Sequence, residues 1–299
     1  MKVLVLAIDG LEAKLVERWN LKGFMQSYWG THDVTTAVKP GDPLYTPLIW
    51  ASFLLGEPAY KYGLSMKTIG NERLKAGYGI LYPIYKLRVV VLGNRKLGVR
   101  ELLTRIGLFS LRRVAKRMKE VERIPSKAID KTIVKHVEKM GFKVWIEEFP
   151  TYNDDIVAEY RAMMSRYFDS PLDERLRKLD EVYEYSIKLL NRAVSALNSH
   201  ELVFYYTPLI DHANHMLYRS SIRLRMLLHS YYKRLSNNVE KISKNINKHS
   251  ALLIISDHGY NPRTHEHGNY GFWSLNLEPP IKPRTILDFY KLILALINI

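Results

Sequence analysis

The sequence contains no cysteine. This absence excludes disulfide bonds, thiolate zinc sites, cysteine nucleophiles and iron–sulfur clusters. A bound metal would therefore have to be held by imidazole, carboxylate or hydroxyl groups. A chain without cysteine also fits a reducing compartment or a hot habitat, and we expect a cytoplasmic protein.

Acidic residues are in the minority. The chain has 30 Asp and Glu against 45 Lys and Arg, so its formal net charge is +15. Such a surplus favours anionic partners, among them phosphorylated small molecules, nucleic acid and anionic membranes. The densest basic stretch is Arg95–Arg123, where apolar residues recur at helical spacing. We interpret this stretch as a solvated amphipathic helix. A nucleic-acid groove is the alternative, although no recognisable binding module accompanies it.

Long apolar runs, internal repeats and low-complexity stretches are also missing, and 47% of the 299 residues are hydrophobic. These features predict a folded chain, and we expect a single domain over 1–299 with a helical basic insertion at about 65–140. The apolar run Lys2–Ile8 is too short to span a bilayer and predicts a buried strand. The C-terminal run Ile286–Ile299 predicts a helix that docks on the body, with membrane contact as the alternative.

Strand-like and helix-like segments alternate along the chain. This alternation predicts a three-layer α/β/α fold with a mostly parallel central sheet, because parallel strands need helical crossovers. The predicted strands lie at 2–8, 32–38, 141–150, 201–207 and 251–256, and the predicted helices at 11–19, 48–56, 127–140, 154–167, 171–198 and 212–248. In such folds the ligand binds beyond the carboxyl ends of the strands.

Metal-type residues follow three of the predicted strands. Asp9 follows the first strand, Asp211 and His215 follow the fourth, and the pair Asp257-His258 follows the last. The spacing of Asp211 and His215 puts both side chains on one face of a helix. Taken alone, each of these groups could equally be a polar turn or a pair of surface residues, and not a set of metal ligands. Their coincidence at one edge of the predicted sheet indicates a metal site.

Short motifs in this chain resemble those of the alkaline phosphatase superfamily, and more narrowly its type I phosphodiesterase/nucleotide pyrophosphatase branch in a compact, archaeal-like form. The matching segments are VLAIDG, YTPLIWASFLLGEP, DHANH, SDHG and HGNYGFW, which extend from residue 5 to about residue 273. The region between about 65 and 140 carries no match. The resemblance implies an alkaline phosphatase-like fold and a metal-dependent hydrolase of phosphate esters.

The resemblance also implies a ligand set for two divalent metal ions, which we expect to be zinc. One ion would be held by Asp211, His215 and His267. The other would be held by Asp9, Asp257, His258 and Thr46. The Thr46 hydroxyl would at the same time be the nucleophile, so that the reaction passes through a covalent phosphothreonine.

Other side chains of the same types compete for these roles. His215 is preferred because it completes the helical pair, and His267 because the Y-G-F-W context of the family follows it. Thr46 is preferred because it stands at a loop-to-helix junction. The competing side chains are His212 and His265, which we place at the rim of the site, and Thr35 and Thr36 in a strand-like stretch.

Phosphodiesters are the expected substrates, in a phosphorylated small molecule or a nucleotide-like compound. One departure from the family bears on this expectation. Members that cleave nucleotides usually carry an asparagine three residues after the nucleophile, and Ile49 stands there. Phosphomonoesterase and phosphotransferase activities are the alternatives within the superfamily. From a different class, the alternative is a non-catalytic basic protein that binds nucleic acid or an anionic membrane.

Overall fold

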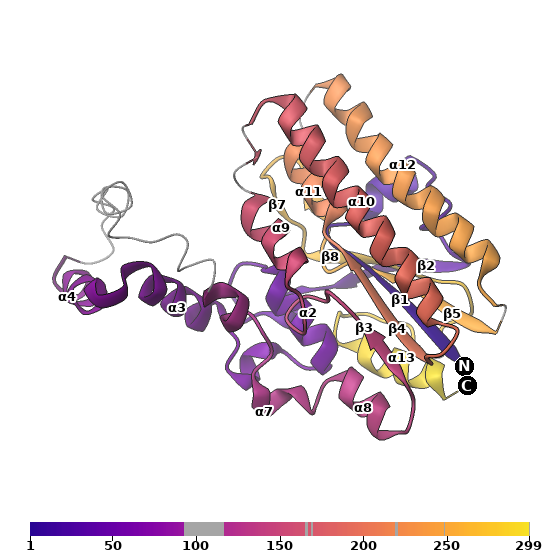
Figure 1. The fold of residues 1–299 in the computed structure, drawn as a ribbon, viewed down its shortest axis with the longest axis horizontal. Helices are drawn as coiled ribbons and strands as arrows, with labels where there is room; N and C mark the ends of the chain where they lie inside the picture. The colour runs from indigo at the N-terminus through magenta and orange to yellow at the C-terminus, as the bar shows by residue number, and fades with distance from the viewer. Residues whose placement is uncertain (93–116, 165–166, 169, 219–220, 248, 299) are drawn as a thin grey trace.

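A computed structural model describes residues 1–298 apart from 93–116, 165–166, 169, 219–220 and 248. Its centre is a six-stranded sheet with the order β2-β8-β5-β1-β4-β3 (Figure 1). The strands are β1 (Lys2–Ile8), β2 (Tyr28–Asp33), β3 (Val144–Ile146), β4 (Leu202–Thr207), β5 (Ser250–Ile255) and β8 (Tyr270–Leu275). A separate two-stranded sheet joins β6 (Tyr260–Asn261) to β7 (Glu266–His267).

The middle of the sheet is parallel. Strand β1 lies between β4 and β5 and pairs with both in parallel, and β3 is parallel to β4. Nearly every residue of β1, β4 and β5 is buried, as expected for parallel strands covered on both faces. The sheet is mixed because β8 runs antiparallel to both β5 and β2. The prediction of an α/β fold with a mostly parallel sheet is confirmed.

Helices cover both faces of the sheet (Figure 1). Alternate residues of β1 point to opposite sides, so Val3 and Val5 join one apolar cluster while Leu4 and Leu6 join the other. The helices over the first face are α2 (Thr46–Leu55), α7 (Ser126–Ile129), α8 (Ile133–Lys139) and α13 (Asp288–Ile297). Those over the second face are α1 (Ala13–Arg18), α10 (Leu172–Ala196), α11 (Leu209–Leu217) and α12 (Ile222–Asn245).

An arm of helices extends away from the sheet (Figure 1). It contains α3 (Met66–Tyr78), the 3₁₀ turn η3 (Gly79–Leu81) and α4 (Tyr82–Leu92), within the range where the sequence predicts an insertion. Most of the predicted basic helix at Arg95–Arg123 lies outside the described residues. Its last part is described, and residues 117–121 are helical there. Among the helices that the structure describes, none has both the length and the apolar character needed to cross a bilayer.

Several predicted boundaries are wrong for local reasons. The strand predicted at 32–38 lies earlier, at β2, because Asp33 Oδ1 accepts a hydrogen bond from the Thr35 amide and the chain turns into η1 (Thr35–Ala37). The helix predicted at 127–140 is divided into α7 and α8, since the Thr132 hydroxyl caps a new helix by accepting from the Lys135 amide. The helix predicted at 212–248 is likewise two helices, α11 and α12.

The remaining predicted elements agree with the structure within a few residues. The predicted C-terminal helix is α13, which packs against β1, α2 and α8. The helix predicted at 154–167 is α9 (Ile156–Met164), and its Val157 belongs to the same core as α2. The helix predicted at 48–56 is α2, which begins two residues earlier, so that Thr46 is its first residue. Strand β8 and helices α3 and α4 were not predicted.

Candidate metal centre

The three central strands bring the expected side chains to one edge of the sheet. Asp9 directly follows β1, and Asp257 and His258 follow β5. Helix α11 begins two residues after β4 and carries Asp211 in its first turn. Because β4, β1 and β5 are adjacent and parallel, their carboxyl ends lie side by side. These four side chains are almost completely buried.

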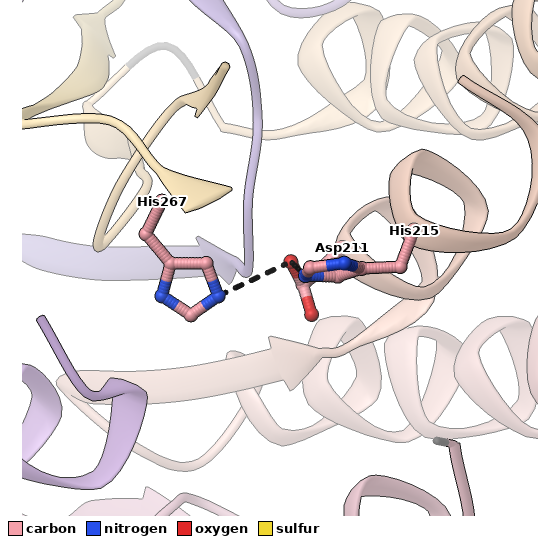
Figure 2. Close-up of side chains that lie close together, drawn as sticks. All are labelled: Asp211, His215 and His267. Carbon is pink, nitrogen blue, oxygen red and sulfur yellow. Dashed lines mark ion pairs between the residues drawn. The ribbon is translucent and has the colours of Figure 1, made fainter. Parts of the chain in front are cut away.

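One group of ligand-type atoms joins helix α11 to strand β7 (Figure 2). Asp211 Oδ1 lies 3.3 Å from His215 Nε2 and 4.0 Å from His267 Nε2. The i, i+4 spacing on α11 aligns the first two residues, and β7 presents His267 toward them. The three ligand-type atoms lie within 4.8 Å of one another. They are the three residues that the family resemblance implies for one metal ion.

A second group surrounds His258 Nε2. This atom lies 3.1 Å from Asp9 Oδ1, 3.4 Å from Asp257 Oδ2 and 3.3 Å from Thr46 Oγ1. The structure therefore brings together the four residues predicted for the other ion. The structure also shows a feature that was not predicted. A carboxylate oxygen of Asp211 lies within 4.8 Å of the ligand-type atoms of Asp9 and His258. Asp211 thus belongs to both groups and links them.

Buried carboxylate oxygens that lack a hydrogen bond are the strongest sign of a cation site. Asp9 Oδ1, Asp211 Oδ1 and Asp257 Oδ2 are buried without one, and each lies 3.1–3.4 Å from an imidazole nitrogen of His258 or His215. A buried anionic oxygen is costly unless a cation or a donor compensates its charge. The other oxygen of two of these carboxylates is anchored, since Tyr206 donates to Asp9 Oδ2 at 2.5 Å and the Gly10 amide donates to Asp257 Oδ1 at 3.2 Å. On Asp9 and Asp257 these anchors leave the second oxygen facing His258 Nε2.

The electrostatics of the cluster point the same way. Burial alone would lower the pKa of His258, but the negative charges of Asp257 and Asp9 override it and raise that pKa to about 10. Burial and repulsion by Asp9 also raise the pKa of Asp257 well above its ordinary value. The cluster thus carries an excess of negative charge that binds a proton in the absence of another cation. This donor set of nitrogen and oxygen atoms fits a divalent ion such as Zn²⁺.

The ring of His258 is held in the orientation that a metal ligand needs. Its Nδ1 lies 2.9 Å from the Gly259 carbonyl oxygen, so the ring donates there and leaves Nε2 facing Asp9. Metal-binding imidazoles commonly use one ring nitrogen in this way to fix the other. The ring also stacks on His267, with 3.6 Å between the ring centroids and 9° between the planes.

Gly10 permits the close approach of β1 and α11. Its φ is +67°, and a Cβ atom there would lie 2.8 Å from the Asp211 Cβ. The Gly10 carbonyl accepts from Asn214 at 2.7 Å, and Tyr232 donates to the Asn214 side chain at 3.0 Å. The Asp-Gly pair is therefore more than a turn signal, because any side chain at position 10 would separate Asp9 from Asp211.

Thr46 lies at the start of α2, with its hydroxyl turned toward His258. Every residue of α2 is buried, so packing on all sides fixes the position of this helix. The amino end of a helix carries partial positive charge and attracts anions. Thr35, one of the competing threonines, instead bonds to Asp33 through its hydroxyl. Of the threonines considered, Thr46 is the one with a described hydrogen bond to the cluster.

The competing imidazoles lie outside both groups. His212 is buried on α11, and burial lowers its pKa to about 4. His265 contacts the Tyr260 hydroxyl at 3.0 Å and lines a cavity next to His215 and His267.

This cavity measures about 590 Å³, and its other wall is the loop 38–44. It provides room for a ligand beside the first group of residues.

Sequence reasoning missed the residues that brace this site. Tyr206 lies in an apolar strand and reads as core, yet it anchors Asp9. Tyr45 donates to Glu122, which lies 3.9 Å from the guanidinium of Arg161. Arg161 also binds Asp154 at 2.5 Å, and its Nη1 is buried without an acceptor. In the sequence, only the position of Tyr45 next to Thr46 points to a residue near the site. Nothing in the sequence of α9 indicates that Arg161 lies close to it.

The chain matches no protein-family model and no curated protein. Among solved structures, it is similar to the PH0037 protein from Pyrococcus horikoshii, with a TM-score of 0.46 and 12% sequence identity. The similarity covers 99% of this chain and 96% of that chain. At this level the likeness assigns neither a family nor an activity.

Proposed function

We propose that the protein is a two-metal hydrolase of phosphate esters, with phosphodiesters as its substrates and Thr46 as its nucleophile. The observation that carries the proposal is the convergence of three buried carboxylate oxygens, from Asp9, Asp211 and Asp257, that have no hydrogen bond and lie next to imidazole nitrogens. A hydroxyl lies at the same place, with Thr46 Oγ1 3.3 Å from His258 Nε2. The arrangement supports the expectation drawn from the resemblance to the alkaline phosphatase superfamily.

Each metal ion has its ligands in this proposal. Asp211, His215 and His267 hold one ion. The other is held by Asp9, Asp257, His258 and Thr46. Bound divalent ions neutralise charge on the phosphoryl oxygens and lower the pKa of a coordinated hydroxyl, which is otherwise a weak nucleophile at neutral pH.

The reaction proceeds through Thr46. Its Oγ1 forms a bond to phosphorus and loses its proton, while the bond from phosphorus to the ester oxygen breaks and that oxygen takes up a proton, which gives a phosphothreonine and an alcohol. Water then attacks phosphorus and the phosphorus–Oγ1 bond breaks, so that the phosphate product leaves and a proton from the water restores the hydroxyl. The amino end of α2 stabilises negative charge on the phosphoryl group during both steps. Burial of the site keeps the reacting groups in a medium where such electrostatic effects are strong.

Two features bear on the kind of ester. The cavity of about 590 Å³ beside His215 and His267 has room for a second ester group, which favours a diester over a monoester. Ile49 supplies no hydrogen bond to a phosphoryl oxygen, so another donor has to hold that atom. The unpaired Nη1 of Arg161 is a buried donor whose charge acts on Tyr206 and His212, and it is our candidate. Phosphomonoesterase activity is the second candidate function.

A substrate comparison tests the reaction class. The metal-loaded protein should hydrolyse bis-(nitrophenyl) phosphate faster than nitrophenyl phosphate, and nitrophenyl sulfate slowest of the three. The reason is that the cavity accommodates the second ester group and the basic surface attracts the anion. The same protein treated with a chelator is the control and should be inactive with all three. A preference for the sulfate ester would contradict the proposed class.

Metal binding can be measured without activity. Elemental analysis of zinc-loaded protein should give two ions per chain, since the two groups of ligands are distinct apart from Asp211. Zinc should also raise the melting temperature by roughly 5–10 °C at saturating concentrations, because binding to the native state alone contributes about 3–4 kcal/mol at 100 to 1,000 times Kd. A protein that binds no divalent ion with all these side chains intact would overturn the two-metal proposal.

A further inference from the structure

The outer side of the arm is apolar. Ile80, Ile84 and Leu87 are 94%, 65% and 65% exposed. They lie four and three residues apart, and the chain stays helical from η3 into α4, so the three side chains share one side of the arm. Pro83 is also exposed on this stretch. A surface helix normally turns its apolar residues inward, and here a second set of them is turned outward.

The inner side of the arm is already occupied. Tyr78 is buried in a small cluster of its own, in which Tyr82, Tyr85 and Met118 pack around it. The rings of Tyr78 and Tyr85 stack with 4.4 Å between their centroids. Since these contacts hold α3, η3 and α4 together, the outer apolar side is not needed to fold the arm. Within the described part of the chain, this side is exposed and available to bind something else.

The sequence around this apolar side is basic. From residue 73 to residue 92 the sequence has Arg73, Lys75, Lys86 and Arg88 and no Asp or Glu. Lys86 is exposed and lies 5.4 Å from the ring centroid of Tyr82. Lys75 is 61% exposed and pairs with Glu72 at 3.5 Å. Apolar side chains next to cations, with tyrosines beneath them, match the interface of an anionic lipid bilayer.

Other partners fit these observations less well. A second copy of the chain would bring the same positive charge to the contact and would be repelled. Nucleic acid would be bound by the cations alone and would leave the exposed isoleucines and leucine without a role. A lipid surface with anionic headgroups satisfies both the apolar side chains and the charges.

We propose that the outer side of η3 and α4 binds an anionic membrane surface, with Ile80, Ile84 and Leu87 inserted among the acyl chains and Lys86 at the level of the lipid phosphates. The arm lies in the interface rather than across the bilayer. The base of the arm is connected to the centre, because Arg117 pairs with Glu72 of α3 and Glu122, five residues after Arg117, accepts a hydrogen bond from Tyr45 beside Thr46. The proposal requires no hydrolytic activity.

Vesicle sedimentation with the full chain tests the proposal. The protein should sediment with vesicles of phosphatidylcholine and phosphatidylglycerol, and at least about tenfold less with phosphatidylcholine alone, because anionic lipid attracts the cations. The triple variant Ile80→Ser/Ile84→Ser/Leu87→Ser should lose at least about tenfold in affinity for the mixed vesicles. Lys86→Gln should weaken binding at low salt and have less effect at high salt.

A matched control comes from another exposed apolar pair. Ile222 and Met226 on α12 are 71% and 68% exposed, so Ile222→Ser/Met226→Ser removes similar surface at a different place and should leave vesicle binding unchanged. Melting temperatures close to that of the unaltered protein would show that both variants fold. Unchanged binding by the triple variant, or no binding to either kind of vesicle, would overturn the proposal. A dimer in solution that the triple variant converts to a monomer would instead make this side a contact between copies.

Discussion

Replacing Thr46 with alanine should reduce turnover at least about a thousandfold while leaving metal binding and the fold intact. The variant removes the hydroxyl that would form the covalent intermediate. Asp9, Asp257 and His258 remain and carry the charge and the imidazole nitrogen that hold the ion. The side chain is small and makes a single described hydrogen-bonding contact, to His258, so its loss should cost little stability. Turnover, elemental analysis and the melting temperature together check this result.

Two further variants make the result specific. Thr46→Ser keeps a hydroxyl at nearly the same place and should retain part of the activity. Thr35→Ala removes a hydroxyl that lines the neighbouring cavity but bonds to Asp33, and it should leave turnover within a few-fold of the unaltered protein. Full activity in Thr46→Ala would mean that water attacks phosphorus directly. Thr46 would then be a structural residue at the start of α2.

The sheet edge could be predicted because it depends on short-range patterns. Continuous apolar runs ending in Asp9 and in Asp257 indicate buried parallel strands, and such strands end at a common edge. The i, i+4 pair of Asp211 and His215 follows from helix geometry alone. The observed groups contain every carboxylate and imidazole chosen in this way or through the resemblance, although their roles as ligands stay predictions.

The rest depends on contacts between distant parts of the chain. Strand β8 is not evident from the sequence because it depends on pairing with β5 and β2, which lie far apart in the chain. Tyr206 looks like any core residue until the carboxylate of Asp9 is placed beside it. The double membership of Asp211 is likewise invisible in a spacing pattern, since it depends on how closely β1 approaches α11 at Gly10.

Because Asp211 belongs to both groups of ligand-type atoms, replacing it should strongly reduce metal binding. Asp211→Asn keeps the size of the side chain but removes its negative charge, and Asp211 lies within 4.8 Å of the ligand-type atoms of both groups. We expect this variant to lose nearly all bound metal, not one ion of two. His267→Asn is the matched comparison, because His267 belongs to the first group only, and it should retain about one ion per chain. Elemental analysis after zinc loading measures both values.

The two outcomes for Asp211→Asn distinguish two designs of the centre. If the variant keeps one ion, then Asp211 serves only the group with His215 and His267, as the resemblance implies, and the second ion depends on Asp9, Asp257 and His258. If it loses both, the single carboxylate couples the two positions, because each ion needs the negative charge that lies between them. Melting temperatures with and without zinc separate either outcome from simple misfolding: a folded variant keeps the metal-free melting temperature and loses the rise on adding zinc.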